Sequence, residues 1–145
     1  MGTWGEGPFD NDDVADWVDE LAESTPDERP ALLRVALSAA VDEEGYLEAS
    51  EGAVAVAAAS IVAAALPGGP PLGDDVELSG EDVGELLVDR DLIGLALRAL
   101  RRVVGEDSEL LELWQEADDA DGLREQIEPV ERALAAAAAR GEPGR

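Results

Sequence analysis

The chain contains no lysine, histidine or cysteine, and all of its 10 basic residues are arginine. A P-loop nucleotide site and a pyridoxal Schiff base both need lysine, so both classes are excluded. Ser-His-Asp hydrolysis, Cys-His thiol chemistry and zinc sites built from Cys or His are excluded in the same way. An enzyme built here would have to use carboxylates, hydroxyls, the single Tyr46, arginines or an oxygen-ligated metal.

Targeting and membrane signals are also absent. The N-terminus has neither the basic region nor the apolar core of a signal peptide. The longest uncharged, mainly apolar stretch runs from Ala53 to Leu66 and is mostly alanine, whereas a membrane span needs about 20 strongly apolar residues. We therefore expect a soluble cytoplasmic protein that does not bind membranes.

Acidic residues dominate what is present. The chain has 35 Asp and Glu residues and a formal net charge of −25. Three explanations stay open: codon usage in a GC-rich genome, adaptation to high salt, and attraction of a basic partner or mimicry of nucleic acid. Binding of nucleic acid itself is disfavoured, because only Arg98, Arg101 and Arg102 cluster and these could neutralise few phosphates.

Helical periodicity runs through nearly the whole chain and predicts an all-α fold. We expect a single domain over residues 1–145, an irregular bundle of five to seven helices with a glycine-rich N-terminal segment packed on it. The first helix is predicted over residues 12–23. An alanine-rich third helix is predicted over 48–65, followed by a proline- and glycine-rich loop over 67–78.

The second helix carries its own start and stop signals. Thr25 and Glu28 have capping-box spacing, with Pro26 at the first helical position. The acidic run that ends at Gly45 should terminate the helix, with Gly45 in a left-handed conformation. Pro30 leaves the exact start of the helix open, and the helix is predicted to end after Val41.

The second half of the chain continues the pattern. A helical stretch runs over residues 79–104 with an interruption near Asp89, and its broad apolar stripe predicts the central helix of the bundle. Ser108 should cap the next helix. The last helix is predicted over 122–140, kinked or restarted at Pro129, and residues 141–145 should form a flexible tail.

Three segments carry a resemblance to a known family. Residues 1–12 read MGTWGEGPFDND and are followed by Asp16, residues 45–48 read GYLE, and residues 108–114 read SELLELW. In this order they resemble the bacterial family called domain of unknown function 4259. The resemblance implies a bacterial origin and a shared fold, and it implies no reaction.

The opening segment has two interpretations. Its glycines permit tight backbone paths that would pack it on the bundle, with the acidic residues capping the first helix. Alternatively it forms a binding lip in which an aromatic ring stacks on a partner and oxygen atoms bind arginine or a cation. The residues of this lip would be Trp4, Phe9, Asp10, Asn11, Asp12 and Asp16.

One stretch comes near to a calcium-binding loop. In residues 117–128 the spacing of Asp119, Gly122 and Glu128 fits an EF-hand, but Ala117 replaces the first carboxylate. A specific calcium site is therefore disfavoured against a turn at Gly122 between two helices. We expect no metal, no cofactor and no catalytic residue.

Two function classes remain. The favoured hypothesis is a non-catalytic protein-interaction module, an immunity or regulatory factor for a basic partner such as a toxin or a nucleic-acid-binding protein. The alternative is a hydrolase or nucleotide-processing enzyme that uses carboxylates and a divalent metal. A homodimer formed through the apolar stripes is also left open.

Overall fold

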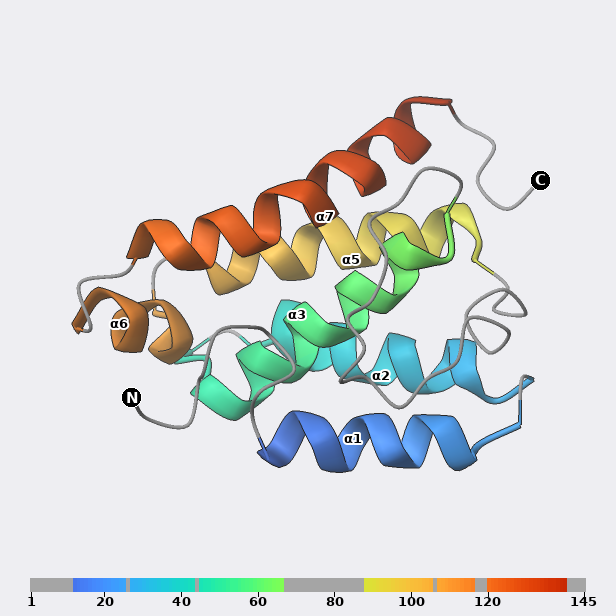
Figure 1. Ribbon diagram of the computed structural model, residues 1–145, viewed down its shortest axis with the longest axis horizontal. Coiled ribbons are helices and arrows are strands. Elements are labelled where there is room, and N and C mark those ends of the chain that lie inside the picture. The colour runs from blue at the N-terminus through green and yellow to red at the C-terminus, as the bar shows by residue number, and fades with distance from the viewer. Residues whose placement is uncertain are drawn as a thin grey trace.

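The computed structural model describes residues 12–25, 27–43, 45–66, 88–105, 107–116 and 120–140. These residues form six helices (Figure 1). The helices are α1 (Asp12–Glu23), α2 (Arg29–Val41), α3 (Ala49–Ala64), α5 (Arg90–Val103), α6 (Glu109–Glu116) and α7 (Ala120–Arg140). The all-α prediction is confirmed. The predicted loop over 67–78, the tail over 141–145 and the segment before α1 lie outside the described residues.

The alanine-rich helix α3 lies at the centre of the described bundle. It packs against all five other described helices, and every residue from Ala55 to Ala63 is buried. Alanine has the highest helix propensity, and its small side chain lets neighbouring helices approach closely. The prediction had given the central position to α5, which packs chiefly against α2, α3 and α7. In Figure 1, α5 and α7 run side by side along one edge of the bundle.

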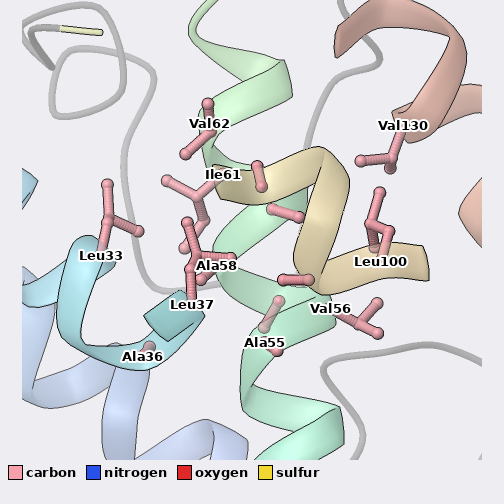
Figure 2. Close-up of a cluster of buried hydrophobic side chains, with 14 of the residues drawn as sticks. Leu33, Ala36, Leu37, Ala55, Val56, Ala58, Ile61, Val62, Leu100 and Val130 are labelled. Atoms are coloured by element: carbon pink, nitrogen blue, oxygen red, sulfur yellow. The ribbon is translucent and has the colours of Figure 1, made fainter. Parts of the chain in front are cut away.

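The core is aliphatic. Figure 2 shows Leu33 and Leu37 of α2 pointing toward Ile61 of α3, and Val130 of α7 pointing toward Leu100 of α5. All five side chains are buried. Burying a Leu, Ile or Val side chain contributes about 1.5–3 kcal/mol, so these contacts account for the association of the helices.

Arg29 connects α1 to α2. Its side chain is 6% exposed, and its Nε and Nη2 donate to the carbonyls of Leu21 and Ala22 at 3.0 and 2.9 Å. These carbonyls belong to the last turn of α1, where the regular helical hydrogen bonds end, and the Leu21 carbonyl also accepts from the Ser24 amide at 3.1 Å. Arg29 therefore caps α1 with a cation at the negative end of its dipole.

The capping-box spacing before α2 gives one of the two contacts of a capping box, and the structure fixes the start of the helix that Pro30 left open. The Thr25 amide donates to Glu28 Oε1 at 3.2 Å, as a capping box requires. However, α2 begins at Arg29, with Pro30 in its first turn, and Glu28 is its N-cap residue. The Thr25–Glu28 contact closes the turn that leads into the helix, where the Thr25 carbonyl accepts from the amides of Glu28 at 2.9 Å and Arg29 at 3.2 Å.

The expected interruption near Asp89 is the start of α5. The Asp89 side chain accepts a hydrogen bond from the Leu92 amide at 2.8 Å, which is the geometry of an N-cap. Its second oxygen binds Arg34 Nη2 at 2.7 Å. Asp89 thus begins α5 and also joins it to α2.

Two turn predictions are wrong. Gly45 is not left-handed; the left-handed residue of this part of the fold is Asp107, with φ 58°. Gly122 lies inside α7, which also runs through Pro129 without restarting. The apolar stripe of α7 includes Ile127 and Leu134, which are buried in the core. The free energy gained by this burial offsets the roughly 1 kcal/mol by which glycine disfavours a helix.

Within the described part of the chain, no helix combines the length and the apolar character needed to cross a membrane.

Candidate functional site

The residues of the predicted binding lip are largely outside the described part of the chain. This applies to Trp4, Phe9, Asp10 and Asn11. Asp12 is the first residue of α1, and Asp16, one turn later, has an exposed side chain. The prediction of a lip therefore stays a prediction.

The structure brings together the other two segments of the family resemblance. Leu47, just before α3, and Ser108, just before α6, form a single parallel β-bridge. The Leu47 amide donates to the Asp107 carbonyl at 2.7 Å, and the Glu109 amide donates to the Leu47 carbonyl at 2.9 Å. We call this contact between residues 43–49 and residues 102–112 the loop junction.

Arg102 fastens the loop junction from the end of α5. Its Nη2 donates to the Gly45 carbonyl at 2.6 Å, its Nε to the Glu43 carbonyl at 3.3 Å and its Nη1 to the Asp107 carbonyl at 3.3 Å. The planar guanidinium presents several donors at fixed angles, and lysine could not reproduce this pattern. One member of the predicted arginine cluster is therefore structural, whereas Arg98 and Arg101 are exposed.

Two side chains cap the helices that leave the loop junction. Ser108 Oγ accepts from the Leu111 amide at 3.4 Å, which confirms Ser108 as the cap of α6. Glu109 Oε1 accepts from the Ala49 amide at 2.8 Å, so a carboxylate from α6 lies at the positive end of α3. Gly52 adds close packing, because a Cβ there would lie 3.4 Å from Leu110 Cβ.

Tyr46 projects from this rigid base. Its side chain is 46% exposed, and its hydroxyl donates to Glu112 Oε1 at 2.5 Å. Glu109 and Glu116 lie one turn either side of Glu112 on α6, close enough to act on the phenol. We call Tyr46, Glu109, Glu112 and Glu116 the acidic tyrosine face.

The carboxylates keep the phenol protonated. The hydrogen bond to Glu112 is the main cause that raises the pKa of Tyr46 to about 12, followed by desolvation and by the negative charges of the three glutamates. A phenol with this pKa is a hydrogen-bond donor at neutral pH and a poor base or nucleophile. At neutral pH the acidic tyrosine face therefore presents a protonated phenol that is bonded to a carboxylate.

The stretch that resembles a calcium-binding loop lies partly within the described residues. The stretch resembling an EF-hand is helical from Ala120 onward, so Asp121, Glu125 and Glu128 lie along α7 and not in a loop. No group of three or more acidic side chains in the described ranges is arranged to hold a metal ion.

Only part of this site has a signal in the sequence. Tyr46 stood out as the single tyrosine, and both sides of the loop junction belong to the segments that resemble the family. Their meeting in space, and the role of Arg102, have no local sequence pattern, because they depend on contacts between residues far apart in the chain.

A family model described as domain of unknown function (DUF4259) matches residues 2–126. No curated protein and no solved structure matches the chain.

Proposed function

We propose, for a chain that belongs to the DUF4259 family, that it is a non-catalytic protein-interaction module for a basic partner. The description of the family assigns no activity, so the function is inferred from the surface of this chain. The observation that carries the proposal is the acidic tyrosine face. It combines an exposed aromatic ring with three carboxylates on a base held by hydrogen bonds.

The ring supplies the contact area. Tyrosine is enriched at protein interfaces because it buries a large apolar surface with few rotatable bonds and keeps a polar tip. Tyr46 is held by Glu112, and its backbone neighbour Gly45 is held by Arg102. Little conformational entropy remains to be lost on binding, which favours affinity.

The charges select the partner. Two arginines, Arg29 and Arg102, bond to backbone carbonyls, and the ion pairs recorded among the described residues are Arg34–Asp89 and Arg132–Glu128. Glu112 and Glu116 are exposed. A surface of this kind accelerates encounter with a basic protein and disfavours an acidic one. We propose an immunity or regulatory role in the bacterial cytoplasm.

The test compares three forms of the protein as baits in a bacterial lysate at low salt. The first is the wild type, and the second carries Tyr46→Ala, Glu112→Gln and Glu116→Gln. The control carries Glu20→Gln and Glu23→Gln on α1, both exposed, and loses the same number of charges. We expect the wild type and the control to recover the same basic protein, and the variant of the acidic tyrosine face to lose it.

Salt provides the second readout. The recovered protein should elute as the ionic strength rises, since exposed charge pairs are screened. Recovery of an identical set of proteins by all three baits, or of nothing specific by any, would contradict the proposal.

A further inference from the structure

A groove lies between α2 and α3, on residues that the acidic tyrosine face does not use. It is lined by Ala36 and Ala39 of α2 and by Ser50, Glu51 and Val54 of α3, with a volume of about 240 Å³. Pockets for cofactors and drug-sized molecules are usually about 300–1,000 Å³ and enclose their ligand. This groove is smaller and open, and its size suits one or two aliphatic side chains.

An exposed apolar stripe runs along α2 beside the groove. Ala31, Val35 and Ala39 are spaced one turn apart and are all exposed, Val35 to 68%. A single exposed valine is ordinary. Here Val35 lies one turn from Ala39, which lines the groove. The small alanines leave room for another helix to pack against α2 with the two helix axes about 8–10 Å apart.

The surroundings of the groove are acidic. Glu51 lines it, and the turn that closes its end carries the exposed Asp42 and Glu48. Residues 35–54 contain no basic residue. Arg34, next to this range, is paired with Asp89, and Arg102, which reaches the turn from α5, bonds to the carbonyls of Glu43 and Gly45. An occupant that brings its own cations would therefore gain favourable charge contacts along the groove edge.

A second copy of the chain fits these charges poorly. Two-fold pairing through this groove would bring the acidic edges of both copies into one interface, and each copy has a net charge of −25. The complementary occupant is a helix with aliphatic residues on one face and lysine or arginine beside them.

We propose that the groove between α2 and α3 docks an amphipathic, basic helix of the partner protein. An aliphatic side chain of this helix inserts between Ala39 and Val54, and its cations face Asp42, Glu48 and Glu51. This inference rests on the proposed function, to which it adds the secondary structure and the side-chain pattern of the partner.

The probe is a labelled synthetic peptide of about 18 residues, with leucine at helical i, i+3, i+4 spacing and lysine elsewhere. A second peptide has the same composition in a scrambled order. Binding to the full chain is measured by fluorescence anisotropy at low salt. Ala39→Trp fills the groove from an exposed position, and Ala136→Trp, on the exposed side of α7, is the matched control.

We expect the amphipathic peptide to bind about tenfold more tightly than the scrambled one, since only the first can insert aliphatic side chains. Ala39→Trp should remove this advantage, and Ala136→Trp should keep it. Val35→Ser, which adds no volume, should weaken binding of the amphipathic peptide in the same direction. Glu51→Gln should reduce the dependence of its affinity on salt.

The outcomes separate this inference from the proposed function. If both peptides bind equally, or if Ala39→Trp binds like the wild type, the groove proposal is overturned while the acidic interaction module stands. If neither peptide binds at low salt, the groove proposal is likewise overturned, while the proposed function is decided by the lysate experiment on the acidic tyrosine face. Sedimentation that shows a wild-type dimer dissociated by Ala39→Trp would overturn the proposal by making a second copy the occupant.

Discussion

Arginine has an architectural use in this chain, which has no lysine. Arg29 binds two carbonyls at the end of α1, and Arg102 binds three carbonyls across the loop junction. The guanidinium can do this because its donors are coplanar and fork-shaped, and because it stays charged at any physiological pH. Part of the positive charge therefore serves to hold backbone in place.

Tyr46 offers a direct test of the loop junction, because it is the only tyrosine. Its phenol should titrate with a pKa of about 12, above the ordinary value of 10.0, as followed by ultraviolet absorbance. Glu112→Gln should lower this pKa toward 10.0, since it removes the negative charge that stabilises the protonated phenol and leaves only a neutral amide oxygen as acceptor.

The raised pKa of Tyr46 makes the stability of the fold depend on pH in the alkaline range. Between pH 10 and pH 12 the unfolded tyrosine ionises while the folded one keeps its proton, so the free energy of unfolding should fall as the pH rises through this window. Tyr46→Phe should lack both the absorbance change and this part of the pH dependence. A wild-type phenol that titrates at its ordinary value would show that the bond to Glu112 does not persist in solution.

At the scale of elements, helix boundaries were predictable where a side chain caps its own helix. The start of α6 follows from Ser108, and the break before α5 follows from Asp89, because N-caps act over three residues. The exact start of α2 did not follow from the capping-box spacing, because that spacing belongs to the turn that leads into the helix. The turn predicted at Gly122 is absent because packing of α7 outweighs the local preference of glycine. The loop junction had no local signal at all.

Gly94 gives an element-scale prediction. It lies within α5, and a Cβ added there would meet nothing within 4 Å. Gly94→Ala should therefore raise the free energy of unfolding by about 0.5–1 kcal/mol, because alanine has the better helix propensity and restricts the unfolded chain. Chemical denaturation measures the change.

Gly105, just after α5, provides the comparison. A Cβ there would lie 3.1 Å from the Arg101 carbonyl oxygen, closer than ordinary van der Waals contact. Gly105→Ala should therefore give no stabilisation. Equal stabilisation by both substitutions would contradict the prediction that a Cβ has room at residue 94 and is crowded at residue 105.

At the scale of the whole molecule, the net charge of −25 opposes compaction. Raising the NaCl concentration from about 10 mM to about 1 M should shorten the screening length from tens of ångströms to about 3 Å and raise Tm by roughly 5 °C. The measurement is thermal denaturation followed by circular dichroism.

Repeating the salt series near pH 4 is the internal control. Asp and Glu side chains have reference pKa values of about 4, so lowering the pH to this range reduces the net negative charge, and the same salt step should raise Tm by less. A Tm that does not respond to salt at neutral pH would mean that the carboxylates are spaced widely enough to avoid appreciable repulsion.

The buried alanines of α3 have an evolutionary consequence. From Ala55 to Ala63 every position is enclosed, and most of these side chains are already the smallest that a helix favours. Nearly any replacement adds atoms to a filled space, and overpacking destabilises a core by about 1–3 kcal/mol. Sequence drift at these positions should be slow and should proceed through paired changes, in which a neighbouring helix loses the volume that α3 gains.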